Sequence, residues 1–288
     1  MAEVTGSIEQ ASPRSGWQRF WDRGGWWRAF LFAVLYIAVY LGVGLLVGLL
    51  RDGADDGDVL ESSGAVFFDL LLPILVMGLL LVAFVATTGW RREVFGPQPV
   101  AGRPWMWGAV VLVLVPVVLH VAATDWSSYD VTVVLTVFAL GLCIGLAEEV
   151  LTRGVAVTML RRAGYGEKAV MVLSSLLFGL LHATNLVSGQ QVVAVALTVV
   201  YAFGFGTMMY LSMRVTGSIV PAILLHAATD PTTILATGGV DAHGANAGSD
   251  ALNAFAGTFS ILFVAVAVLA IFLVSGRTGK PAAAPTTS

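Results

Sequence analysis

Charged side chains are scarce in this chain. Only 11% of its 288 residues are Asp, Glu, Lys or Arg, whereas 57% are hydrophobic and the mean hydropathy is +0.86. Soluble domains carry roughly a quarter of their residues charged, so the composition excludes a soluble globular protein. No stretch with the composition of a soluble domain remains between the apolar runs. The sequence therefore predicts a single all-α, polytopic membrane domain that has the lipid bilayer as its surroundings.

Cysteine is nearly absent as well. The single cysteine, Cys143, lies inside an apolar run. One thiol can form no disulfide within the chain and cannot build a cysteine-ligated metal cluster. A buried free cysteine usually packs as a small hydrophobic side chain, so we assign it no catalytic role.

Eight apolar runs are long enough to cross a hydrocarbon core about 30 Å thick. They cover residues 29–50, 65–87, 105–123, 131–160, 169–183, 192–213, 218–235 and 251–274. A Trp- and Arg-rich segment, residues 17–28, precedes the first run and is typical of the membrane interface. We expect the membrane domain to extend over residues 17–274, with disordered tails at 1–16 and 275–288.

The basic residues indicate an orientation. Thirteen of the fifteen Lys and Arg residues lie in tails and loops that an even number of spans places on one side; the exceptions are Arg51 and Arg153. Cytoplasmic segments carry the excess of Lys and Arg, so both termini are predicted to be cytoplasmic. The Ala-, Val- and Gly-rich composition looks bacterial, and we expect a multi-pass protein of the cell inner (cytoplasmic) membrane.

The segment 141–162 carries three charges inside an apolar, helix-period run: Glu148, Glu149 and Arg153. Each charge at membrane depth costs about 2.5–3.5 kcal/mol on insertion scales, and such clusters are functional-site candidates. Glu149 and Arg153 are four residues apart and share a helix face, where they can pair. Glu148 points about 100° away and is free to face a cavity. The alternative is a cluster at a helix end whose long side chains reach the water.

Two later spans carry polar groups at a similar depth. With a rise of about 1.5 Å per residue, Glu148 lies roughly 18 Å from the cytoplasmic end of its helix, His182 roughly 21 Å, His226 roughly 15 Å and Asp230 roughly 21 Å. His226 and Asp230 also share a helix face. The sequence therefore predicts that three spans bring these groups together, around a water that is shielded by lipid and reachable from the cell interior.

Such a cluster suits hydrolysis. A carboxylate beside imidazoles can act as a general base toward water, and His226, oriented by Asp230, could donate a hydrogen bond to a developing oxyanion. A second possibility is zinc or another divalent metal held by Glu148, His182 and His226 with one open position, although no HExxH helix is present. A third is a proton relay in a proton-coupled transporter, although no internal repeat is evident.

Three motifs resemble those of the CPBP family, which includes CAAX prenyl endopeptidases and bacteriocin-processing or immunity (Abi-type) proteins. They are E-E-x-x-x-R at 148–153, F-x-x-x-H at 178–182 and H-x-x-x-D at 226–230, and the resemblance covers about residues 130–235. It implies an intramembrane endopeptidase, of glutamate type or metal-dependent.

The resemblance also implies a role for each motif residue. Glu148 would be the catalytic carboxylate, His182 its partner on the water, His226 and Asp230 the oxyanion-stabilising or orienting pair, and Glu149, Arg153 and Phe178 the supporting residues. The third motif often ends in Asn, but here it ends in Asp230. An ionised carboxylate accepts hydrogen bonds and does not donate them, so we assign Asp230 to orienting His226.

The expected partner is a membrane-associated peptide or protein substrate, and no nucleic acid is expected. The identity of the substrate, its lipidation and the oligomeric state stay open. A catalytically silent immunity or scaffold protein is the remaining alternative, beside the transporter.

Overall fold

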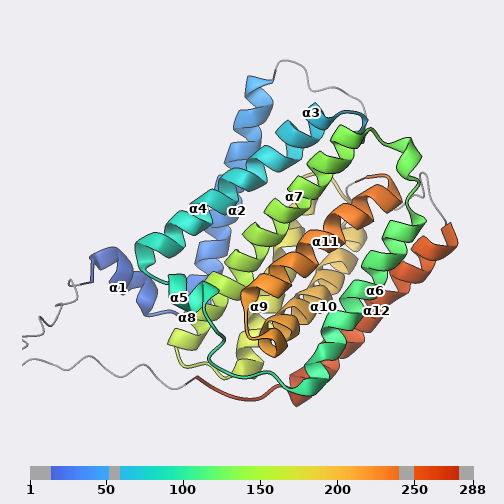
Figure 1. Ribbon diagram of the computed structural model, residues 1–288. Coiled ribbons are helices and arrows are strands. Elements are labelled where there is room, and N and C mark those ends of the chain that lie inside the picture. Colours follow the sequence, from blue (N-terminus) through green and yellow to red (C-terminus); the bar gives the residue numbers. More distant parts are fainter. Residues whose placement is uncertain (1–13, 52–58, 240–249, 279–288) are drawn as a thin grey trace, which may run out of the picture.

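The structure is a computed structural model that describes residues 14–51, 59–239 and 250–278. The predicted all-α class is confirmed: the described residues are mostly helical and contain no β-strand, and an isolated bridge joins Gly166 and Arg277. Within these described ranges, eight helical segments are long and apolar enough to cross a membrane. Figure 1 shows them as one bundle with tilted neighbours.

The eight spans agree with the predicted ranges to within three residues at each end. They are α2 (Trp26–Leu50); α3 (Ser63–Ala65), η2 (Val66–Leu71) and α4 (Leu72–Thr88); η3 (Pro104–Met106) and α6 (Trp107–Ala123); α7 (Val131–Glu149), η5 (Val150–Ala156) and α8 (Val157–Arg162); α9 (Glu167–Leu181) and η6 (His182–Leu186); α10 (Val192–Thr216); α11 (Ile219–Thr237); and α12 (Asp250–Leu273). Short helices outside the spans are α1 (Gly16–Asp22), η1 (Val59–Glu61), α5 (Arg91–Phe95) and η4 (Trp126–Ser128).

The predicted tails fall mostly outside the described residues, which begin at residue 14 and end at residue 278. Where the structure describes them, they are held in place. Ser15 caps α1 by accepting a hydrogen bond from the Gln18 N–H, and the Gly276 carbonyl accepts one from the Glu167 N–H. The hydrogen bonds of Ser15 and Gly276 thus lie just outside the predicted range of residues 17–274.

Side-chain caps mark the N-terminal ends of the two helices that carry most of the site. Asp130 caps α7 by accepting from the Thr132 N–H, and Ser218 caps α11 by accepting from the Val220 N–H. Such caps satisfy backbone N–H groups that have no partner within the helix. Directly after Glu149, the fourth span continues as the π-helix η5, a local widening that is frequent at functional sites.

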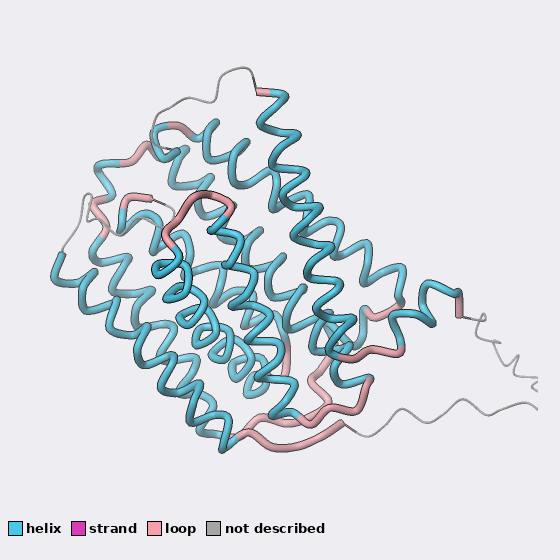
Figure 2. Tube along the Cα trace, turned by 180° about the vertical axis from the view of Figure 1, so that it is seen from behind, coloured by secondary structure: helices cyan, strands magenta, loops and turns pink. Residues whose placement is uncertain are grey.

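Helices α7 and α11 pack against each other at the centre of the bundle (Figure 1). Helix α4 covers the other side of α7, while α6 packs against α11. Helix α10 packs against both α9 and α12, and Figure 2 shows the helical bundle from behind. The motif-bearing helices α7, α9 and α11 thus share one interior, which the remaining spans enclose.

Two glycines let α7 and α11 approach each other closely. A Cβ atom on Gly145 would lie 2.7 Å from the Ile223 carbonyl oxygen and 2.8 Å from the Ala227 nitrogen. One turn earlier, a Cβ on Gly141 would lie 2.5 Å from Cδ of Pro231. Small residues four positions apart are how membrane helices bring their backbones together. This contact brings the end of α7, with its two glutamates, beside His226.

We expect Gly145→Ala to lower the free energy of unfolding by about 1–3 kcal/mol, because an added methyl group in a packed interface forces the backbones apart. Thermal unfolding of the detergent-solubilised protein measures the change. Gly42→Ala is the matched control: it lies inside α2 with no atom within 4 Å of its added Cβ, and its effect should be neutral or stabilising by up to about 1 kcal/mol. Equal stability of the two variants would contradict the close-contact interpretation.

Candidate active site

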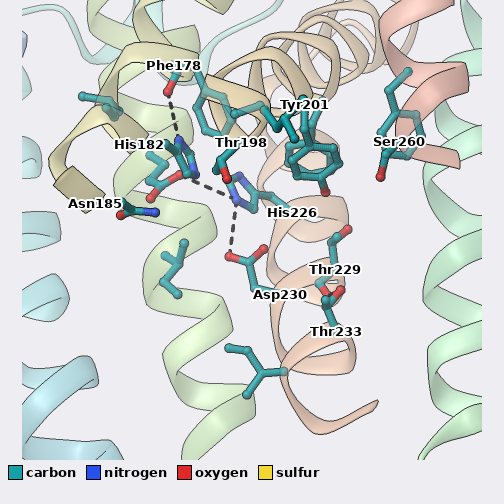
Figure 3. Close-up of a pocket in the computed structure, with 18 of the residues that line it drawn as sticks. Phe178, His182, Asn185, Thr198, Tyr201, His226, Thr229, Asp230, Thr233 and Ser260 are labelled. Atoms are coloured by element: carbon teal, nitrogen blue, oxygen red, sulfur yellow. Dashed lines mark hydrogen bonds and ion pairs between the residues drawn. The ribbon is translucent and has the colours of Figure 1, made fainter. Parts of the chain in front are cut away.

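A cavity of about 1280 Å³ lies inside the bundle. All four predicted catalytic residues line it, together with Phe178. Figure 3 shows His226 between His182 and Asp230, with Thr229 and Thr233 on the same helix as Asp230. The three spans predicted to converge therefore meet at one cavity. The catalytic residues lie at one end of it, as their positions on the helices show.

Glu148 faces this cavity and lies beside His226. Its Oε2 is 3.8 Å from Nε2 of His226, and its side chain is 21% exposed whereas that of His226 is 3% exposed. One water can bridge a separation of this size. Asp230 approaches the same ring nitrogen, with Oδ2 3.4 Å from Nε2. Two carboxylates thus meet at Nε2 of one imidazole.

The other ring nitrogen of His226 is held by Glu149. Nδ1 lies 2.9 Å from Oε1 of Glu149, and the same oxygen accepts a hydrogen bond of 3.1 Å from Arg153. A hydrogen bond at one ring nitrogen determines the tautomer and orientation of a histidine. We predicted that Asp230 orients His226; in the structure the shorter contact comes from Glu149, because α7 and α11 pack so closely. Asp230 instead lies on the cavity side of the ring.

Arg153 is buried in the interior, and neither its side chain nor that of Glu149 has any exposed surface. Besides Glu149, the guanidinium donates to the Thr152 hydroxyl and to the Gly206 carbonyl. Burying a charge is tolerated when it is paired and hydrogen-bonded. Arg153 therefore does not reach toward water at a helix end, which excludes the interfacial alternative.

Phe178 connects the ion pair to both histidines. The Arg153 guanidinium carbon lies 4.6 Å from the centre of its ring, within the range of a cation–π contact. The ring centres of His226 and His182 lie 5.7 and 5.3 Å from that of Phe178. This packing explains why a phenylalanine in the second motif supports the site without carrying polar chemistry.

His182 is the first residue of η6, where α9 gives way to a 3₁₀ turn. Its Nδ1 lies 3.2 Å from the Phe178 carbonyl oxygen, which leaves Nε2 as the nitrogen directed away from the backbone. His182 lies within electrostatic reach of Glu148, and both line the cavity. The first two motifs thus each contribute a side chain to the same cavity.

The metal alternative fits the geometry less well. Across the described ranges, no three His, Cys, Asp or Glu side chains are grouped closely enough to hold a metal ion. Nδ1 of each histidine is held by another acceptor, Glu149 or the Phe178 carbonyl, so Nε2 is the ring nitrogen that a metal would use. Because the side chains are not grouped, Glu148, His182 and His226 do not form a ready ligand set.

Several cavity residues were not predicted. Tyr36 and Tyr40 of α2 line the cavity within electrostatic reach of Glu148. His120 of α6 also lines it, with Nδ1 3.1 Å from the Thr233 hydroxyl. No local pattern marks these side chains. The close helix contact was not predicted either, although the G-x-x-x-G spacing at 141–145 is a sequence signal for it.

We expect Arg153→Met to lower the free energy of unfolding by about 3–5 kcal/mol, because it leaves the buried Glu149 without its ion-pair partner. Pairing it with Glu149→Gln should recover part of that loss, since no unpaired buried charge then remains. The control is Arg51→Gln, which removes a partly exposed pair with Asp69 and should change stability by less than about 1 kcal/mol. The measurement is the denaturation midpoint of each variant in the same detergent. Similar losses of stability for Arg153→Met and Arg51→Gln would argue against a buried ion pair.

Comparison with known proteins agrees with this arrangement. The family model for type II CAAX prenyl endopeptidase Rce1-like proteins matches residues 130–232, a range that includes all three motifs. A search of the curated proteins found no match. The resemblance that the motifs carried is thereby confirmed: residues 130–232 match the model of the CPBP/CAAX protease family, and at the family level this match supports an intramembrane CAAX-type endopeptidase.

Proposed function

We propose that the protein hydrolyses a peptide bond of a membrane-associated peptide or protein, with Glu148 as general base. The observation that carries this proposal is the position of Glu148: a carboxylate on the cavity wall, 3.8 Å from His226, in the same cavity that His182 lines. A carboxylate and two imidazoles around a space large enough for a water and a peptide carbonyl suit water activation.

In the proposed reaction, Glu148 accepts a proton from a water that His182 helps to hold. The resulting hydroxide attacks the carbonyl carbon and forms a tetrahedral intermediate. The C–N bond then breaks, and Glu148 returns the proton to the leaving amine. Nε2 of His226, when protonated, donates to the carbonyl oxygen as it becomes negative. Glu149 and Arg153 act indirectly, because they hold the His226 ring.

Asp230 has a supporting place in this scheme. Its carboxylate lies 3.4 Å from Nε2 of His226, so it favours a proton on that nitrogen and thus keeps the donor available. Since an ionised carboxylate cannot itself donate, Asp230 does not bind the oxyanion directly. The cavity is large enough for an extended segment of several residues, which agrees with an endopeptidase.

We expect Glu148→Gln to lower kcat by about 10²–10⁴, the usual contribution of a positioned general base. Glutamine keeps the shape and removes the basicity, so the unfolding temperature should stay close to that of the unaltered protein. The assay is the appearance of new peptide termini, read by mass spectrometry, from a library of membrane-anchored peptides in proteoliposomes. Glu61→Gln, at an exposed glutamate of η1, is the matched control and should cleave normally.

Undiminished cleavage by a folded Glu148→Gln variant would refute the proposal. Proton flux that requires Glu148, together with absence of cleavage, would favour the transporter. If a cellular phenotype survived loss of Glu148, His182 and His226 together, the protein would be an immunity or scaffold protein.

Chelation tests the metal alternative separately. We expect the cleavage rate to be unchanged after dialysis against a chelator, and the purified protein to contain less than one equivalent of transition metal, because the candidate ligands are not gathered as a set. Loss of activity that zinc restores would instead support a metal-dependent mechanism. Glu148→Gln, treated in parallel, shows whether any residual cleavage comes from a contaminant.

A further inference from the structure

The helix ends of this protein form two unlike faces. One, which we call the basic face, consists of the ends at Arg28, Arg92, Arg103, Arg162, Arg214 and Arg277. Ion pairs and hydrogen bonds join these ends: Arg162 binds Asp22 and Glu93, and Arg103 donates to Ser275. Figure 1 shows α1, α5 and α8 together at this end of the bundle. The opposite face carries the end of α11 and the start of α12.

The half of the bundle between the catalytic residues and the basic face is closed. Six large side chains from η5, α8 and α10 fill it, none more than 1% exposed: Leu151, Val155, Met159, Met208, Met209 and Leu211. Nearer the basic face, buried Glu167 binds Arg161 and Arg214 in a network of ion pairs. A peptide has no path through an interior packed in this way.

The cavity lies entirely in the other half. On α7 its lining reaches Glu148 and goes no further toward the basic face, and on α10 it stops at Phe205. On α11, which runs in the opposite direction, the lining begins at His226 and continues to Thr237 and Gly239. Because α11 runs antiparallel to α7 and α10, the last lining residues of α7 and α10 and the first lining residue of α11 lie at the same depth. The catalytic residues are therefore the inner end of a cavity directed toward the opposite face.

Polar groups line the route from the opposite face to the site. Asn253, in the first turn of α12, and Thr237, in the last turn of α11, lie at its outer end. Farther in are Thr233, Thr229 and Ser260, and Figure 3 shows Ser260 on α12 and the threonines on α11. The threonine hydroxyls donate to carbonyls of their own helix, and their oxygens can still accept hydrogen bonds. An extended peptide backbone needs such acceptors for its N–H groups wherever water is excluded.

We propose that the substrate peptide enters from the opposite face, which the distribution of Lys and Arg places outside the cytoplasm. This reverses the expectation that the site is reached from the cell interior. The substrate is then an extended extracytoplasmic segment of an exported peptide or of a membrane protein. That a substrate enters the cavity rests on the proposed function, but the direction of access to the cavity can be measured without any cleavage.

The test uses the single native cysteine. In a Cys143→Ala background, Ser260→Cys places a thiol inside the cavity, and Ser275→Cys places a matched thiol on the basic face, where Ser275 is exposed. A positively charged, membrane-impermeant thiol reagent is applied to right-side-out and to inverted membrane vesicles. We expect Ser260→Cys to be modified only in right-side-out vesicles and Ser275→Cys only in inverted vesicles. The cation suits a cavity that contains Glu148 and Asp230.

Any other result for Ser260→Cys overturns the proposal. Modification only in inverted vesicles would mean access from the cytoplasm, and modification in both would mean a cavity open to both sides. Failure to react in either kind of vesicle, with Ser275→Cys reacting as expected, would mean entry from the lipid. Adding Glu148→Gln should leave the labelling unchanged, so failure of the proposed function would not be confused with failure of this inference.

Discussion

A buried guanidinium makes the arrangement of the candidate site possible. Glu148 and Glu149 are neighbours in an apolar interior, where two unpaired carboxylates would be strongly unfavourable. Arg153 neutralises Glu149 within the same helix face, and Glu149 then uses the same oxygen to hold Nδ1 of His226. The other oxygen of Glu149 has no hydrogen-bond partner among the described residues. The link from Arg153 to His226 thus depends on a single atom, Oε1 of Glu149. The orientation of the His226 imidazole depends on this link.

The close contact of α7 and α11 determines the distance between Glu149 and His226. The Gly141 and Gly145 backbones lie against Pro231 and Ala227. The glutamate side chains at the end of α7 are therefore close enough to contact His226 of α11. In lipid, the hydrophobic effect does not drive helices together, and packing of small residues does much of that work. A contact made without polar side chains therefore sets the distances within the polar site beside it.

The two halves of the bundle have different tasks. The half toward the basic face combines tight packing with ion pairs around Glu167, and it provides the rigid support that a positioned catalytic group requires. The other half encloses the cavity and keeps threonine, asparagine and serine side chains along its wall. The packed half and the cavity are thereby separated along the bundle, with the proposed catalytic residues at the boundary between them.

The eight spans could be predicted because a hydrocarbon core demands long apolar helices and excludes other lipid-exposed backbone. The common depth of Glu148, His182 and His226 could be predicted because the rise of an α-helix is constant. The rotation and tilt of each helix could not, since they depend on packing between residues far apart in the chain. Contacts of that kind decided that Glu149, 77 positions from His226, holds its ring, and that the cavity extends away from the basic helix ends.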